Sequence, residues 1–324
     1  MHNSRKLKIT IKLVAFLLVI LAVNHVLNYL FIPYSYIRVD YHNIENRDYD
    51  MVFVGTSHGK CGIDPEAVDE VTGKKSVNLC LGGEYLSYTY YMVKEICRHH
   101  VPEEIIYEVD GGYWTTDEYI GTDSSSIFGE MKWSGVKAEF FLDRLFDKDF
   151  RITIFPWYVY RKEYKMIPEN VKNKTSGSYK NMDTDVFKNS SQEYRKNGFI
   201  YRYPVADEAK DFTNFVEWDA EEIREENEEY LEKLVKFCEE QGIKLTLLIT
   251  PVPRETLEMY EDSYREEHEY FSRMAQKYKL TLLDFNYEQM NGFDNSLSSY
   301  VDYEGHMNGE SAVAFSRILG EYLR

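Results

Sequence analysis

The sequence predicts an α/β fold: a three-layer α/β/α sandwich around a mainly parallel sheet. Two observations support this prediction. Short apolar runs rich in β-branched residues alternate with longer segments whose apolar residues recur at helical spacing. Glycines and helix-capping residues stand between them, where strands end and helices begin. Alternation of this kind builds a parallel sheet with helices on both faces.

The first part of the pattern lies in the first third of the chain. Asp64 and Pro65 form a helix start, because Asp is a good N-cap and Pro a good first helical residue. Gly82 and Gly83 make a turn before the next helix. The expected elements are strands at 50–54, 75–79 and 104–109, a short helix from residue 64 and a helix over 84–97.

The rhythm fails between about 114 and 219, a stretch rich in aromatic residues, Lys, Asn and Ser. We expect an insertion there, either a lid or substrate-binding subdomain at the carboxyl edge of the sheet or a peripheral elaboration. The α/β pattern then resumes. Its expected elements are helices over 220–240, 256–278 and 310–323 and strands over 244–249 and 280–285.

The amino terminus carries an apolar run, residues 13–32, whose length fits a helix that spans a bilayer. Four basic residues precede it, and the positive-inside rule then places the amino terminus in the cytoplasm. We therefore expect a cytoplasmic tail (1–12), a single transmembrane anchor (13–32), a polar linker (33–48) and an extracytoplasmic domain (49–324). A cleaved signal peptide is the alternative.

The chain is strongly acidic, with a formal net charge of −17 over 324 residues. Such a charge repels phosphate backbones, so we expect no nucleic acid as partner. No G-x-G-x-x-G motif follows the first strand, which argues against a dinucleotide-binding protein.

Two polar segments carry candidate catalytic residues. Ser57 follows Gly55 directly after the first strand, at the edge where α/β sheets present reactive groups. Near the other end, Asp302 and His306 lie on one expected loop. A serine nucleophile needs a base, and the base needs an acceptor that holds its tautomer. Taken alone, each segment is more typical of a polar turn or of a capped helix start than of a catalytic site.

Together these segments resemble the SGNH/GDSL hydrolase superfamily. Within it, the chain is similar to membrane-anchored acyltransferase-like proteins of bacterial cell envelopes, the branch that includes the D-alanine transfer protein of lipoteichoic acid synthesis. The resemblance implies a flavodoxin-like α/β/α sandwich. The matching blocks are Gly55-Thr56-Ser57-His58, Gly62-Ile63-Asp64-Pro65, Val77 to Gly83, and Asp302, His306 and Asn308.

The resemblance also implies roles for individual residues. Ser57 would be the nucleophile, His306 the base and Asp302 its orienting acid, with the Ser57 and Gly83 amides as oxyanion hole. It implies no cofactor and no metal. Other residues expected to line the substrate site are His58, Asp110, Arg254 and Asn308.

Two departures from the family pattern concern these roles. Asp302 stands four residues before His306 instead of the usual three, which leaves Glu304 and Asp294 as alternative acids. The segment around Asp110 also lacks the Asn that usually donates to the oxyanion.

The expected function is serine-dependent O-acyl transfer or ester hydrolysis on a cell-envelope polysaccharide or polymer. The expected partners are that polymer, an acyl donor and a multi-span membrane acyltransferase. A plain extracytoplasmic esterase and a non-catalytic assembly factor that binds polymer are the alternatives.

Overall fold

The structure is a computed structural model that describes residues 2–83, 85–118, 122–145, 149–210, 212 and 216–324. The chain forms two compact units. One unit consists of residues 1–35 and 138–183, and the other of residues 36–137 and 184–324.

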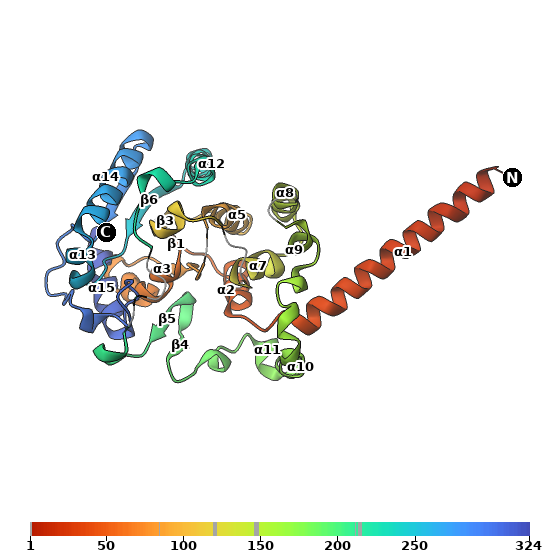
Figure 1. Ribbon diagram of the computed structural model, residues 1–324, viewed down its shortest axis with the longest axis horizontal. Coiled ribbons are helices and arrows are strands. Elements are labelled where there is room, and N and C mark those ends of the chain that lie inside the picture. The colour runs from red at the N-terminus through yellow and green to blue at the C-terminus, as the bar shows by residue number, and fades with distance from the viewer. Residues whose placement is uncertain (1, 84, 119–121, 146–148, 211, 213–215) are drawn as a thin grey trace. The chain divides into compact units, whose positions relative to one another are not determined.

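The larger unit is built on a five-stranded sheet in the order β2-β1-β3-β6-β7, and every neighbouring pair is parallel. This arrangement confirms the predicted fold class, a mainly parallel sheet between layers of helices (Figure 1). Each strand lies within two residues of its expected bounds. The strands are β1 (Met51–Val54), β2 (Ser76–Asn78), β3 (Glu104–Glu108), β6 (Lys244–Ile249) and β7 (Thr281–Asp284).

One face of the sheet packs against the last helix, α15 (Gly309–Tyr322), and against α4 (Pro65–Thr72). Alternate strand residues such as Met51, Phe53 and Ile106 point to this side and pack with Phe315 and Leu319. These side chains are all fully buried. Because a strand presents every second side chain to one face, the apolar strand residues supply cores on both sides.

Helices α5 (Leu86–Cys97) and α12 (Glu225–Gln241) pack on each other beside the sheet (Figure 1). Trp114 joins this layer, since its indole N–H donates to the Tyr107 hydroxyl of β3 and its ring meets Phe271 edge to face. Phe271 lies on α14 (Glu261–Tyr278). The single helix expected over 256–278 is in fact two, because α13 (Arg254–Met259) ends before Tyr260.

The expected insertion is a series of short elements. An antiparallel hairpin, β4 (Gln192–Tyr194) with β5 (Ile200–Arg202), lies within the larger unit. Residues 138–183 instead group with the amino-terminal helix. The helices of the stretch are α6 (Gly112–Thr115), α7 (Thr122–Glu130), α8 (Gly135–Arg144), α9 (Phe150–Ile154), α10 (Ile167–Thr175) and α11 (Gly177–Asn181).

Helix α1 (His2–Phe31) contains the apolar run. It is long and apolar enough to cross a membrane, and the apolar part is exposed rather than packed in a core. The expected linker differs from the structure, because residues 36–46 form helix α2 (Tyr36–Asn46). Ile37 and Ile44 of α2 are buried in the larger unit, so this segment is part of the folded domain.

Candidate active site

Ser57 lies where the first strand of the sheet turns into a helix. Strand β1 ends at Val54, and Gly55 adopts φ = 144°, a value that favours glycine. A side chain there would place its Cβ 2.3 Å from the Glu108 carbonyl oxygen, so no larger residue fits. Thr56 then caps α3 (Ser57–Gly62) by accepting from an amide of the first turn. This geometry makes Ser57 the first residue of a helix at the carboxyl edge of the sheet.

Glu108 holds the turn from beneath. One of its carboxylate oxygens accepts hydrogen bonds from the Thr56 backbone N–H (2.7 Å) and hydroxyl (3.0 Å), while the other has no hydrogen-bond partner among the residues that the structure describes. Burial raises the pKa of Glu108 to about 7, against the weaker opposing effects of the His58 charge and of these bonds. The carboxyl group is therefore a buried support of the turn.

Asn78, at the end of β2, fixes α3 from a second side. Its amide group donates to the carbonyl oxygens of Gly59 (2.8 Å) and Ile63 (2.7 Å), and its oxygen accepts from the Cys80 backbone N–H (3.0 Å). Asn78 is fully buried. The second sequence block therefore holds the serine-bearing helix in place through this side chain.

The loop after β7 brings a histidine and an aspartate to the same edge. His306 Nε2 lies 2.8 Å from Ser57 Oγ, and His306 Nδ1 lies 2.8 Å from Asp302 Oδ2. The other Asp302 oxygen accepts from the backbone N–H groups of Glu304, Gly305 and His306. Gly305 adopts φ = 118°, which lets the loop curl around the carboxylate.

The electrostatics favour an ionised Asp302. Burial by itself would raise the pKa of Asp302, but the hydrogen bond and charge of His306, helped by the charge of His58, outweigh it and lower that pKa. The alternative acids are placed less well. The nearest Glu304 oxygen is 4.0 Å from His306 Nδ1, and Asp294 instead accepts from the backbone N–H of Ser296.

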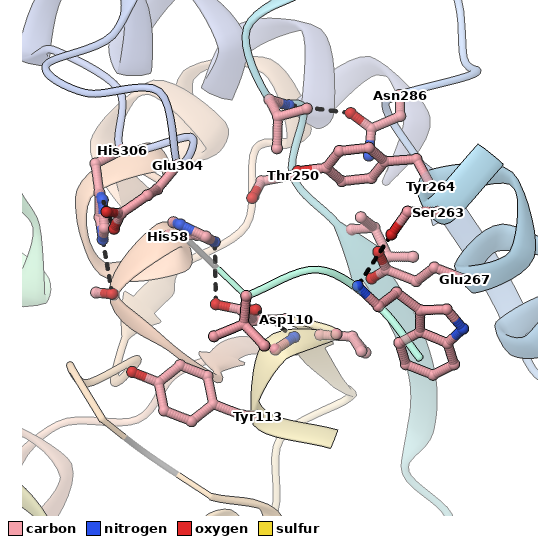
Figure 2. A pocket seen from close by; sticks show the side chains of 18 of the residues that line it. His58, Asp110, Tyr113, Thr250, Ser263, Tyr264, Glu267, Asn286, Glu304 and His306 are labelled. Atoms are coloured by element: carbon pink, nitrogen blue, oxygen red, sulfur yellow. Dashed lines mark hydrogen bonds and ion pairs between the residues drawn. The ribbon is translucent and has the colours of Figure 1, made fainter. Parts of the chain in front are cut away.

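A second histidine lies against the first. The rings of His58 and His306 have centroids 4.5 Å apart, and His58 Nδ1 lies 3.3 Å from Asp110 Oδ2. The other Asp110 oxygen accepts from the Gly112 backbone N–H. Figure 2 shows His58 between His306 and Asp110. The structure therefore brings both of these predicted lining residues into the site, as a second histidine–carboxylate pair.

These residues open into a cavity of about 190 Å³ (Figure 2). Among the residues that the structure describes, its lining contains acidic, aromatic and hydroxyl side chains but no Lys or Arg. The lining is Ser57, His58, Val109, Asp110, Gly111, Gly112, Tyr113, Thr116, Val216, Trp218, Ile249, Thr250, Val252, Ser263, Tyr264, Glu267, Asn286, Glu304 and His306.

The two predicted oxyanion donors are placed differently. The N–H groups of Thr56 and His58 are engaged with Glu108 and the Thr56 hydroxyl, whereas the Ser57 N–H between them has no acceptor within the described part of the chain. Gly83 is not among the residues that line the cavity, whereas Tyr113 is. The role of the Gly83 amide as an oxyanion donor stays a prediction.

Two predicted lining residues lie elsewhere. Arg254 is 60% exposed at the start of α13, near Glu255 and Glu258, and does not line the cavity. Asn308 is buried and caps α15, accepting from the Ser311 N–H and donating to the Ser298 carbonyl. Each is explained by its local structure: a surface charge at a helix start in one case, a helix cap in the other.

Sequence reasoning missed the opposite wall of the cavity, which comes from α14. Tyr264 and Glu267 lie there, across from His306 (Figure 2). Glu267 is buried, and that burial, with the nearby charges of Asp284 and Asp110, raises its pKa well above the usual range. Their spacing on an amphipathic helix was the only signal in the sequence, and it is equally typical of core residues.

One group of side chains has the composition of a metal site. Donor atoms of Asp302, Glu304 and His306 lie within 4.8 Å of one another. However, the carboxylate of Asp302 already engages His306 Nδ1, the atom that would have to bind an ion beside it. The donor set therefore fits a hydrogen-bonded histidine–acid pair better than it fits a metal.

The fold and the site together define an α/β protein with a serine–histidine–aspartate chain at the carboxyl edge of a parallel sheet. No family model matches the sequence, and no curated protein matches it. Among solved structures, it is similar to a "putative lipolytic protein of G-D-S-L family from Desulfitobacterium hafniense DCB-2". The identity is 11% and the TM-score 0.38, over 85% of this chain and 98% of that one. So distant a likeness assigns neither a family nor an activity.

Proposed function

We propose that the protein is a serine-dependent acyl ester enzyme, an O-acyltransferase or an esterase. The observation that carries the proposal is the continuous chain from Ser57 through His306 to Asp302, with both contacts at 2.8 Å. Ser57 and Asp302 are 249 and four residues from His306 in sequence. Ser57 and His306 line one cavity, and Asp302 lies behind His306. Nucleophile, base and orienting acid are the minimum set for acyl transfer.

In the proposed reaction, Ser57 Oγ attacks the carbonyl carbon of an ester while His306 Nε2 takes its proton. Asp302 stabilises the imidazolium that forms and fixes the ring orientation. The Ser57 N–H donates to the oxyanion, and one such donor is worth roughly 3–4 kcal/mol of barrier. When the C–O bond breaks, His306 returns the proton to the leaving alcohol and leaves an acyl-serine.

Release of the acyl group repeats these steps in reverse. His306 removes a proton from water or from an acceptor hydroxyl, whose oxygen attacks the acyl-serine carbonyl and regenerates Ser57. Water gives ester hydrolysis, and a bound hydroxyl gives transfer. We propose that the acceptor or substrate is a cell-envelope polysaccharide or polymer, supplied with acyl groups by a donor and a multi-span membrane acyltransferase. The long apolar helix α1 supports a location at the membrane.

The test is labelling with a serine-directed fluorophosphonate, followed by peptide mapping. We expect covalent modification of Ser57 and none of Ser263, a second serine that lines the same cavity. Labelling should be lost in Ser57→Ala, which has no hydroxyl, and in His306→Ala, which has no base to activate it. The matched control Ser263→Ala should still be labelled. Folded protein that remains unlabelled would contradict the enzyme proposal and favour a polymer-binding assembly factor.

A further inference from the structure

In the smaller unit, the apolar run of α1 contains two asparagines that form hydrogen bonds. Asn24 and Asn28 are polar residues within that run, and both form hydrogen bonds to residues at or just after the end of α9. The Asn24 amide donates to the Ile154 carbonyl (3.0 Å), and the Trp157 backbone N–H donates to the Asn28 side-chain oxygen (3.0 Å). The two asparagines therefore attach residues 154–157 to the side of the helix.

The end of α1 is held by α10 of the same unit. Asn170 donates to the carbonyl oxygens of Leu30 and Phe31, and Lys174 Nζ lies 2.6 Å from the Tyr29 carbonyl oxygen. The last carbonyl groups of a helix have no partner within it, so these side chains act as a cap supplied from a distant segment. Residues 150–175 thus pack along the last part of α1, and we call this segment the collar.

Between the collar and α1 lies an apolar crevice of about 170 Å³. Its α1 wall extends from Val19 to Leu27, and its other wall is Phe155 and Trp157. Val23 is eight residues before the helix end, about 12 Å along the axis at 1.5 Å per residue. If α1 crosses a bilayer over 13–32, the Phe155–Trp157 turn lies inside the leaflet instead of above it.

The charge of the collar region is opposite to that of the whole chain. Residues 150–175 contain six basic and two acidic residues, whereas the full sequence carries −17. Arg161, Lys162 and Lys165 are exposed, next to the exposed ring of Tyr164. Basic and aromatic residues beside a membrane helix are typical of contact with headgroups at the interface.

From these contacts we propose that the collar is a membrane-binding element. The Phe155–Trp157 turn inserts into the leaflet beside α1, the crevice takes an acyl chain of a phospholipid, and the basic residues contact anionic headgroups. This proposal rests on α1 spanning the bilayer but not on the chemistry of Ser57, and it concerns a surface far in sequence from the candidate active site.

The first experiment uses the full chain in nanodiscs, with or without lipids brominated midway along the acyl chain. Trp157 should be quenched by the brominated lipid, so tryptophan emission falls more in the wild type than in Trp157→Phe. Trp133→Phe is the matched control, because Trp133 is 73% exposed in the larger unit and its removal should leave the quenching unchanged. Equal quenching in wild type and Trp157→Phe would overturn the insertion of the turn.

The second experiment varies the fraction of phosphatidylglycerol in the same nanodiscs. We expect Trp157 quenching to rise with that fraction and to lose the dependence when Arg161, Lys162 and Lys165 are all changed to Gln. A control with Lys233→Gln and Lys236→Gln removes exposed charges from α12 and should keep the dependence. Quenching that is indifferent to anionic lipid in the wild type would overturn the headgroup contact.

Discussion

Asp302 uses both of its carboxylate oxygens, one for three backbone N–H groups and one for His306 Nδ1. In Asp302→Asn, the amide oxygen keeps the backbone contacts and the NH₂ group faces His306. The ring must then present an acceptor at Nδ1 and carry its proton on Nε2, where it can no longer accept the Ser57 proton. We expect turnover of an acyl ester to fall by about 10⁴ with little change in melting temperature.

The matched control is Glu304→Gln, because Glu304 lines the same cavity but lies 4.0 Å from His306 Nδ1. It should keep turnover within a few-fold of the wild type. Collapse of turnover in Glu304→Gln together with near-normal turnover in Asp302→Asn would identify Glu304 as the orienting acid.

We expect Glu108 to make the stability of the protein depend on pH. Burial raises its pKa from the usual 4.5 to about 7 in the folded state, so between these values the unfolded chain releases a proton that the native protein keeps. Stability from this group is therefore present at low pH and lost as pH rises, by about 3 kcal/mol in all. In Glu108→Gln the amide oxygen still accepts from Thr56, and this loss should disappear.

The measurement is chemical denaturation of wild type and Glu108→Gln at several pH values from 4.5 to 8. As pH rises, the unfolding free energy of the wild type should fall relative to that of Glu108→Gln. Parallel curves over this range would show that Glu108 has an ordinary pKa in the folded protein.

At the level of single residues, the sequence predicted site residues only where they belong to a local motif. Ser57 follows a strand and a glycine, and Asp302 and His306 share a loop, so their types and positions suggested chemistry. Tyr264 and Glu267 could not be found in this way, because an amphipathic helix has the same pattern whether its buried face meets a core or a cavity. Gly83 was chosen from a turn motif, which does not reveal what its N–H will meet, and its role stays a prediction.

Among the secondary-structure elements, the hairpin β4–β5 packs on β2, the strand whose Asn78 fixes helix α3. Gly198 of the hairpin turn has φ = 94°, and a Cβ there would lie 1.8 Å from the Asn78 carbonyl oxygen. Gly198→Ala should therefore displace the hairpin, destabilise the protein by several kcal/mol and lower turnover, since Asn78 also fixes α3. Urea denaturation and an acyl ester assay measure the two effects.

Gly73→Ala separates backbone strain from the clash. Gly73 also has a positive φ (72°), but nothing lies within 4 Å of a Cβ built there. Its substitution should cost only about 1–2 kcal/mol, the penalty of a left-handed residue, and leave turnover unchanged. Equal losses in the two variants would mean that the close approach at Gly198 is unimportant.

The strands were predictable because buried parallel strands are short, apolar and rich in β-branched residues. Helix α2 was not, because its polar and tyrosine-rich composition is typical of a linker and its buried face shows only in the folded unit. The break at Tyr260 was missed because neither Gly nor Pro marks it. The stretch from 114 to 219 was recognised as an insertion, but its short elements depend on tertiary contacts.

For the whole molecule, we expect α1 to cross a membrane with its amino terminus in the cytoplasm. Arg5, Lys6, Lys8 and Lys12 precede the apolar part of the helix and favour this orientation. Protease added to spheroplasts should digest the domain and spare an amino-terminal epitope, which becomes sensitive once detergent is added. Recovery of the full-length chain in the soluble fraction would contradict the anchor.

The pairing of β3 with β6 has a consequence for how this chain can change. These neighbouring strands are consecutive in the sheet but are separated in sequence by the whole insertion and α12. The cost of closing so long a loop grows only with the logarithm of its length, about 0.6 kcal/mol for each doubling. Since Glu104 to Glu108 fix one end and Lys244 to Leu248 the other, closing the loop sets little limit on the length of chain between them. The limits on this segment come instead from its own contacts, such as the packing of Gly198 on Asn78, so its length is freer to change than the sequence of its hairpin.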